Sequence, residues 1–191
     1  LVYGGEKHVS IAALSPYMKE HTVVVNGMSK SYSMTGWRIG YLAAPKDIAK
    51  AVSSMQSHTT SNACSIAQYA SVAALESEES DKFIEKMQKT FDERRIYMVK
   101  TLQAIKGVVL PEPKGAFYVF ADVSAFYGKS FQGEKVTGSL SFAELALKKG
   151  VAVVPGIAFG DDDCIRLSYA ISIEDIKEGL KRLAEFIAEL K

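Results

Sequence analysis

Cysteine, excess charge and long apolar runs are scarce in this sequence, and each scarcity excludes a class of protein. The 191 residues contain two cysteines, Cys64 and Cys164, which lie far apart in the chain. This pair gives neither a disulfide framework nor a cysteine zinc site, and no histidine has metal-ligand spacing, so we expect no bound metal. Two buried free thiols are the ordinary alternative, and they predict a reducing compartment, the cytoplasm.

Charge of one sign is nearly absent, because 23 lysines and arginines balance 22 aspartates and glutamates for a net charge of +1. This balance gives no electrostatic reason to expect nucleic acid or an anionic membrane as a partner. No apolar run approaches the roughly 20 residues that a membrane-spanning helix needs. A hydrophobic fraction of 48% with 24% charged residues is ordinary for a globular protein.

Hydrophobic periodicity predicts a mixture of helices and strands. Helical spacing is found in residues 46–57, 65–76, 81–105, 141–148 and 173–190. Short apolar segments that predict strands are residues 22–26, 37–44, 108–110, 116–123, 151–154 and 164–169. We expect the strand at 22–26 to be buried on both faces and the helix at 65–76 to be buried around most of its girth. The polar segment 128–138 is expected to be a mobile surface loop.

The segment from Ser29 to Tyr41 carries the most informative chemistry. Lys30 stands where the apolar strand ends, and Arg38 follows eight residues later in a glycine-containing turn. A lysine held at the end of a buried strand is partly desolvated, which lowers its pKa and makes its amine a nucleophile toward an aldehyde. The guanidinium of an arginine is a rigid fork that suits a phosphate. The two side chains therefore suit a ligand that bears both groups.

This segment resembles the Schiff-base lysine signature of the class I and II (fold type I) aminotransferases, which use pyridoxal 5′-phosphate. It contains Ser-Lys, a short spacer and Gly-Trp-Arg-Ile-Gly-Tyr. Its sequence is most similar to that of bacterial aspartate aminotransferases of the Iβ subgroup. Other stretches agree with the family in order and spacing: Gly4–Ile11, Thr60–Gln68, Pro113–Tyr118, Val154–Gly156, Phe159–Gly160 and Arg166–Ala170. The resemblance spans essentially the whole chain.

The resemblance implies roles for four residues. Lys30 would bond covalently to pyridoxal 5′-phosphate and later act as general base, Arg38 and Ser29 would bind its phosphate, and Arg166 would bind the substrate α-carboxylate. For each residue an ordinary alternative exists. An isolated lysine is usually a solvated surface charge, and a strand arginine such as Arg38 can pair with a surface carboxylate. Ser29 could cap or turn the backbone. Arg166 lies among apolar neighbours, where a charged guanidinium needs an anionic partner. That partner could be a carboxylate of the protein in a structural salt bridge instead of the substrate.

The fold class implied is α/β, the C-terminal part of the fold type I transferase fold. Residues 1–105 would be the end of the large cofactor-binding domain with the interdomain helix. Residues 106–191 would be the complete small α+β domain. The family's acidic partner of the pyridine nitrogen and its glycine-rich phosphate loop precede the position of Leu1. We therefore expect the N-terminal half as a structural partner, and no activity from this chain alone.

The implied reaction is transamination between an L-amino acid, aspartate by resemblance, and a 2-oxoacid such as 2-oxoglutarate, in a homodimer. Aromatic, alanine or branched-chain specificity remains open at this point. A β-lyase or synthase would use the same lysine and arginine. A non-catalytic truncated module is a further alternative, because a cofactor without its pyridine-nitrogen partner would be a weak electron sink.

Overall fold

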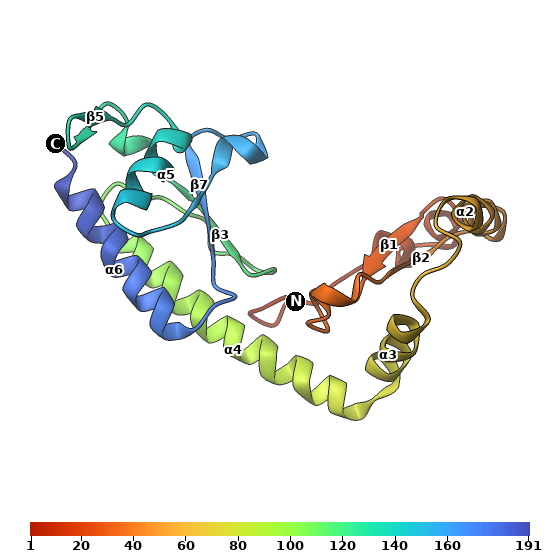
Figure 1. Ribbon diagram of the computed structural model, residues 1–191. Helices are drawn as coiled ribbons and strands as arrows, with labels where there is room; N and C mark the ends of the chain where they lie inside the picture. Colours follow the sequence, from red (N-terminus) through yellow and green to blue (C-terminus); the bar gives the residue numbers. More distant parts are fainter. The chain divides into compact units, whose positions relative to one another are not determined.

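The longest helix, α4 (Glu78–Gln103), contains the point at which the chain divides into two units. The computed structural model describes residues 1–191 (Figure 1). The lysine unit comprises Gly5–Met87, and the C-terminal unit comprises Leu1–Gly4 with Gln88–Lys191. The domain boundary that the resemblance implies near Ile105 stays a prediction. No helix has both the length and the apolarity that crossing a membrane requires.

The lysine unit is built on a two-stranded antiparallel sheet. Strand β1 (Val24–Gly27) pairs with β2 (Gly40–Ala43), and Gly27 lies opposite Gly40 at the end of the ladder. The other elements of this unit are η1 (Ile11–Ala13), α1 (Pro16–Glu20), η2 (Thr35–Trp37), α2 (Lys46–Thr59), α3 (Ser65–Glu76) and the first turns of α4. Helix α1 begins where Ser15 Oγ accepts a hydrogen bond from Met18 N, 3.1 Å away, and proline occupies its first position.

Few side chains are buried in the lysine unit, and two sequence predictions are wrong here. Val25 in β1 is 78% exposed, so this strand is not buried on both faces. Ile66 and Tyr69 in α3 are 70% and 80% exposed, so this helix is not buried on most of its faces. The apolar pattern identifies surfaces that favour burial, but a two-stranded sheet with a few helices does not cover them.

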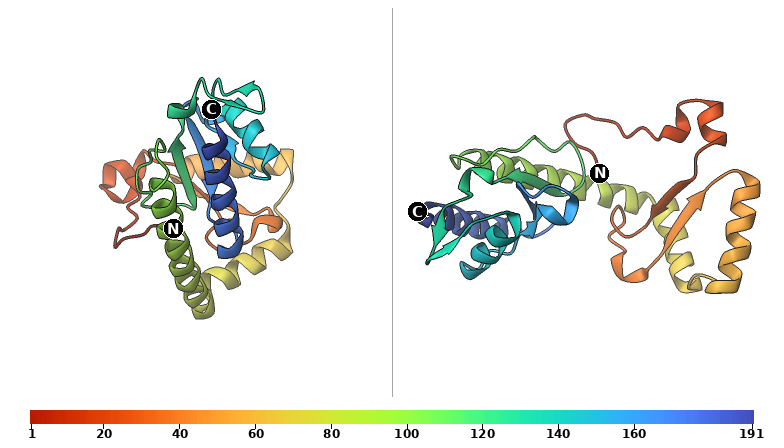
Figure 2. Two further views of the ribbon diagram at one scale, coloured as in Figure 1. Left: turned by 90° about the vertical axis from the view of Figure 1, so that its left-hand side faces the viewer. Right: turned by 90° about the horizontal axis from the view of Figure 1, so that it is seen from above.

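The C-terminal unit contains a three-stranded antiparallel sheet in the order β3-β7-β6. Its strands are β3 (Tyr118–Asp122), β6 (Val154–Pro155) and β7 (Cys164–Ser168). The helices are the second part of α4, α5 (Ser139–Lys148) and α6 (Ile173–Glu189), with the short turns η3 (Ser124–Phe126) and η4 (Gly156–Phe159). Helix α6 runs beside the C-terminal part of α4 (Figures 1 and 2).

One face of this sheet packs into the core, and the other is partly open. Alternate strand residues point to opposite faces. The buried face carries Val119, Ala121, Ile165 and Leu167. The helices supply the rest of the core, including Leu102, Phe142, Leu180, Leu183 and Phe186. Arg166 therefore lies on the opposite, half-buried face.

Two local predictions in this unit are wrong. Residues 108–110 form no strand, and only Val109 makes an isolated pairing with Asp122. The loop predicted to be mobile at 128–138 is a hairpin of β4 (Ser130–Phe131) and β5 (Glu134–Lys135). Its Phe131 ring is buried against that of Phe186, with centroids 5.3 Å apart, and this contact anchors a segment that looks polar in sequence.

Candidate functional site

Lys30 lies in the turn that directly follows β1. Tyr32 N donates to Met28 O at 3.2 Å and Ser33 N donates to Lys30 O at 3.2 Å, and these bonds form the turn. Lys30 is exposed in this chain. The desolvation predicted from a buried strand is therefore not present, because β1 itself is largely uncovered here.

Arg38 stands at the other end of the same loop. It follows η2 and has left-handed backbone angles, φ 50° and ψ 48°, and its Nη1 donates to Thr35 O at 2.9 Å. The prediction that residues 37–39 belong to a strand is wrong, since β2 begins at Gly40. A non-glycine residue in this region costs about 1 kcal/mol, and such strained residues cluster at functional sites.

The pairing of Gly27 with Gly40 places Lys30 and Arg38 at the same end of the ladder. A Cβ on Gly40 would lie 3.0 Å from Asn26 O, so the strands approach closely at the base of the loop and a larger residue there would push Asn26 O aside by a few tenths of an ångström. Ser29 is half-buried in the turn beside Lys30. The loop therefore offers an amine, a guanidinium and a hydroxyl, which fit a ligand that carries an aldehyde and a phosphate.

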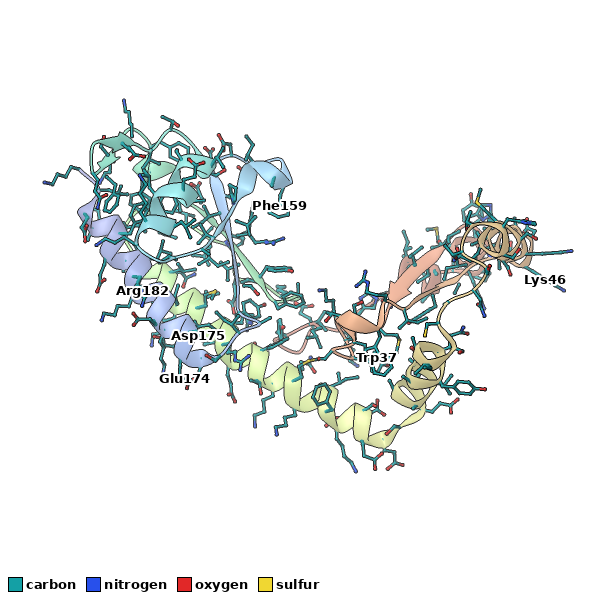
Figure 3. All side chains as sticks on the ribbon, in the orientation of Figure 1. Trp37, Lys46, Phe159, Glu174, Asp175 and Arg182 are labelled. Atoms are coloured by element: carbon teal, nitrogen blue, oxygen red, sulfur yellow. The ribbon has the colours of Figure 1, made fainter.

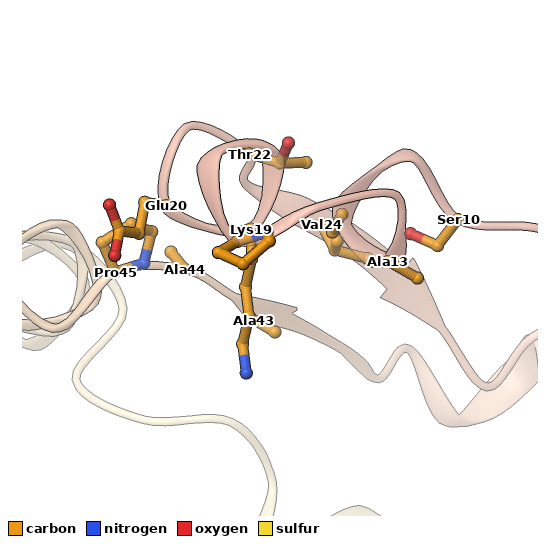
Figure 4. A pocket seen from close by; sticks show the side chains of 11 residues that line it. Ser10, Ala13, Lys19, Glu20, Thr22, Val24, Ala43, Ala44 and Pro45 are labelled. Carbon is orange, nitrogen blue, oxygen red and sulfur yellow. The ribbon is translucent and has the colours of Figure 1, made fainter.

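Two hollows lie in the lysine unit. A pocket of about 400 Å³ adjoins the lysine loop and is lined by Ser33, Gly36, Trp37, Cys64, Ile66 and Ala67. No pattern in the sequence predicts this pocket, because α3 meets the loop only in the folded chain. A groove of about 660 Å³ lies between α1 and the strands, with Lys19, Glu20 and Val24 in its lining (Figure 4). None of the four predicted site residues lines either hollow.

Arg166 lies in β7, which confirms the strand predicted at residues 164–169, and β7 is the middle strand of the C-terminal sheet. Its direct neighbours across the ladders are Phe120 and Val154. Its guanidinium carbon lies 4.4 Å from the ring centroid of Tyr118 and 4.5 Å from that of Phe159. No carboxylate of the chain forms a salt bridge with it, so the structural ion pair considered as an alternative is absent.

Sequence reasoning missed both rings that contact Arg166. Tyr118 lies on the same open face of the sheet as Arg166. Because side chains of a strand alternate between faces, this position follows from the sequence once the pairing of β3 with β7 is known. Phe159 comes from η4, where no periodicity operates. Figure 3 marks Phe159 on this turn.

A second arginine, Arg95, is fully satisfied by the chain. It donates to Asp92 Oδ1 and Glu112 Oε1, both at 2.7 Å, and to Pro113 O at 3.0 Å. Burial acts to lower the pKa of Arg95, but the hydrogen bonds to Glu112 and Asp92 outweigh it and raise the pKa. Arg95 also lies over the Tyr3 ring, 5.4 Å from its centroid, so it ties the first residues of the chain to α4.

Comparison with known proteins gives one consistent family. A sequence model described as aminotransferase class I and II matches residues 1–183. The chain is 44% identical over 190 residues to a probable aspartate/prephenate aminotransferase of Aquifex aeolicus, covering 99% of the chain and 47% of the relative. It is 45% identical over 190 residues to an aspartate aminotransferase of Geobacillus stearothermophilus, covering 98% and 46%.

Solved structures agree with these matches. The aspartate aminotransferase from Rhizobium meliloti superposes with a TM-score of 0.94 and 41% identity, covering 100% of this chain and 48% of that one. The Thermus thermophilus aspartate aminotransferase with maleate gives a TM-score of 0.86 and 39% identity, covering 97% and 45%. The chain spans about half the length of the curated relatives it matches.

Proposed function

The chain belongs to the class I and II aminotransferase family, and we propose that the protein containing it transfers an amino group from an L-amino acid to a 2-oxoacid. The observation that carries the proposal is the loop between β1 and β2, which presents Lys30 and Arg38 at one end of the ladder within the family's lysine signature. Aspartate and 2-oxoglutarate are the proposed substrates, because several relatives are named aspartate aminotransferases.

Pyridoxal 5′-phosphate is the proposed cofactor. The amine of Lys30 would hold its aldehyde carbon, and the Arg38 guanidinium and Ser29 hydroxyl would bind its phosphate. When bound, this cofactor withdraws electrons from the amino acid and makes the proton on its α-carbon acidic. Once the amino group of the substrate has displaced it from the aldehyde carbon, the free amine of Lys30 would move that proton between the substrate α-carbon and the cofactor's C4′ atom.

Arg166 is proposed to bind the substrate α-carboxylate. Its guanidinium has no carboxylate partner in the chain and lies among aromatic rings on a half-buried face, where an unpaired cation is costly. A carboxylate ligand would remove that cost through two parallel hydrogen bonds.

The proposal extends to assembly and location. The exposed apolar side chains of β1 and α3 support a covering partner, and we propose the remaining half of the family fold in that role. A homodimer and the cytoplasm are proposed from the family and from the two free cysteines. A β-lyase, a synthase or a non-catalytic module is not favoured, because the matched relatives are named aminotransferases.

The test uses the full-length protein with added pyridoxal 5′-phosphate, aspartate and 2-oxoglutarate. We expect oxaloacetate and glutamate as products, whereas pyruvate and ammonia would indicate elimination. Borohydride reduction followed by intact-mass measurement should show one cofactor adduct. The adduct should be lost in Lys30→Ala and kept in Lys46→Ala, which removes an exposed lysine at the start of α2. An adduct that survives Lys30→Ala would refute the assignment of Lys30.

A further inference from the structure

The Arg166 guanidinium rests on two aromatic rings that come from different elements. Tyr118 is the first residue of β3, and Phe159 is the last residue of η4. Stacking on a ring uses the face of a guanidinium, whereas hydrogen bonding to a carboxylate uses its edge. The two contacts at 4.4 Å and 4.5 Å therefore restrict the side chain without consuming the N–H groups that a ligand needs.

The turn that carries Phe159 is held in place through its backbone, although the residue itself is 51% exposed. Gly156 begins η4, and a Cβ there would lie 2.2 Å from Cys164 O, so the turn is pressed against β7. Ile157 N donates to Ser139 Oγ at 3.1 Å, and Ser139 Oγ donates to Asp162 Oδ1 at 2.7 Å. These hydrogen bonds, which meet at the buried Ser139, hold the turn, and the Phe159 ring also meets the Phe120 ring edge to face, with centroids 6.2 Å apart.

The backbone just before Tyr118 is anchored by hydrogen bonds, and the Tyr118 ring contacts the Phe117 ring, with centroids 4.4 Å apart. Ala116, two residues earlier, has a left-handed φ of 61°. Its carbonyl accepts hydrogen bonds from the hydroxyls of Tyr3 and Tyr169. These bonds hold Ala116 in a backbone conformation that alanine rarely adopts, two residues before Tyr118.

We propose that Tyr118 and Phe159 are positioning residues that hold the Arg166 guanidinium with its edge presented to the substrate α-carboxylate. This inference rests on the proposed function, in which Arg166 binds that carboxylate. A preset arginine loses less side-chain freedom when the ligand binds, so the rings favour binding without touching the reacting atoms.

The experiment compares variants that remove a ring with variants that keep it, in the full-length protein loaded with pyridoxal 5′-phosphate. Phe159→Leu and Tyr118→Leu remove a ring, whereas Phe159→Tyr and Tyr118→Phe keep it. Calorimetry measures the Kd of maleate, a dicarboxylate without an amino group to transfer, and steady-state kinetics measure KM and kcat. Phe83→Leu is the matched control, because Phe83 in α4 is also half exposed, at 50%.

We expect each ring-removing variant to raise the Kd of maleate and the KM of both substrates by about fivefold or more, equivalent to about 1 kcal/mol. The value of kcat at saturation should change less, because the rings act on binding. The ring-keeping variants and Phe83→Leu should stay within about twofold of the parent. An unchanged Kd in both ring-removing variants would overturn the inference. So would an equal loss in Phe83→Leu.

Arg166→Lys separates this inference from the proposed function. If Arg166→Lys leaves the Kd of maleate unchanged, the proposed role of Arg166 fails. If it raises the Kd while the ring variants do not, only the positioning role fails. In the double variant Phe159→Leu/Arg166→Lys we expect no loss beyond that of Arg166→Lys alone, since the ring acts through the arginine. Additive losses would show that Phe159 acts on the ligand directly and would overturn the inference.

Discussion

Arg95 and Arg166 both lie in the C-terminal unit, but their neighbours differ in kind. Arg95 has two carboxylates and a carbonyl oxygen within hydrogen-bond distance. Arg166 has two aromatic rings and no carboxylate. At the scale of single residues, this contrast separates an arginine that stabilises the fold from one that is available to an anionic ligand.

Replacing Arg95 should therefore cost stability. Arg95→Ala leaves Asp92 and Pro113 O without their donor, and we expect the free energy of unfolding to fall by about 2 kcal/mol. Urea denaturation of the full-length protein measures it. Arg182→Ala is the control, because Arg182 pairs with Glu178 on the exposed face of α6 and such pairs contribute under about 1 kcal/mol. Equal losses in the two variants would contradict the structural role of Arg95.

The two cysteines should differ in reactivity. Burial, reinforced by the carboxylate of Asp161 3.4 Å from its sulfur, raises the pKa of Cys164 to about 12. Cys64 is exposed. Because the thiolate is the reactive form, iodoacetamide at about pH 8 should alkylate Cys64 alone in the folded 191-residue chain and both cysteines in denaturant. Mass spectrometry counts the modifications, and rapid alkylation of Cys164 in the folded chain would contradict the buried position.

At the scale of elements, periodicity located the helices well. The predicted ranges 46–57, 65–76 and 173–190 correspond to α2, α3 and α6, with differences of at most two residues at any end. Long amphipathic patterns carry this information locally. Whether an apolar face is covered depends on other segments, which explains the wrong burial predictions for β1 and α3.

The sequence predicted Arg166 and the residues of one contiguous loop as site residues, but not the side chains that other segments bring to them. Lys30, Arg38 and Ser29 lie in one loop, and their motif indicated a shared role that still awaits its test. The rings on Arg166 come from two other segments, and only strand pairing and the turn η4 bring them there. The left-handed conformation of Arg38 was also missed, because nothing in Gly-Trp-Arg-Ile-Gly distinguishes a 3₁₀ turn from a strand.

The turn η4 approaches β7 closely at Gly156, and a larger residue there should disturb both stability and substrate binding. In Gly156→Ala the added carbon would lie within 2.3 Å of both Cys164 O and Asp161 O, so the turn must move. We expect a loss of about 2 kcal/mol in stability together with a several-fold rise in substrate KM, because Phe159 moves with the turn. Thermal denaturation and kinetics of the full-length protein measure both.

Gly179→Ala is the matched control for this substitution. A Cβ at this position in α6 meets no atom within 4 Å. Alanine favours the helix over glycine by about 1 kcal/mol, so this variant should be slightly more stable than the parent. If Gly156→Ala behaved in the same way, the close approach of η4 to β7 would be refuted.

At the scale of the whole molecule, ionisation should weaken the C-terminal unit in alkali. Burial, together with nearby Asp162 and Asp163, raises the pKa of Tyr127 to about 12, and burial also raises the pKa of Tyr169. The folded chain therefore holds these protons more tightly than the unfolded chain, whose tyrosines titrate near about pH 10. Stability from these groups is complete below about pH 10 and falls as the pH rises toward 12.

Urea denaturation between about pH 8 and 11 tests this dependence. We expect Tyr127→Phe to have a shallower loss of stability above about pH 10 than the parent, because it lacks one of the shifted groups. Tyr17→Phe is the control, since Tyr17 is 66% exposed. A loss of the same slope in Tyr127→Phe and in the parent would contradict the contribution of Tyr127.

The hydrophobic core cluster lies entirely in the C-terminal unit. The core cluster joins Tyr3, α4, the sheet, α5 and α6, whereas the lysine unit buries only Met28, Met34, Ala67 and Ser71. Local opening is easiest where few apolar contacts close over the backbone. In the 191-residue chain we therefore expect amide hydrogens of β3, β7 and α6 to exchange slowly and those of β1 and α3 to exchange fast. Adding the proposed N-terminal half of the family fold as a separate polypeptide should slow exchange in β1 and α3 by about tenfold or more and leave the C-terminal unit unchanged. It should also produce transamination, which we expect the chain alone to lack. Slow exchange of β1 and α3 without any partner would show instead that the lysine unit is stable by itself, and the need for a covering half would then be wrong.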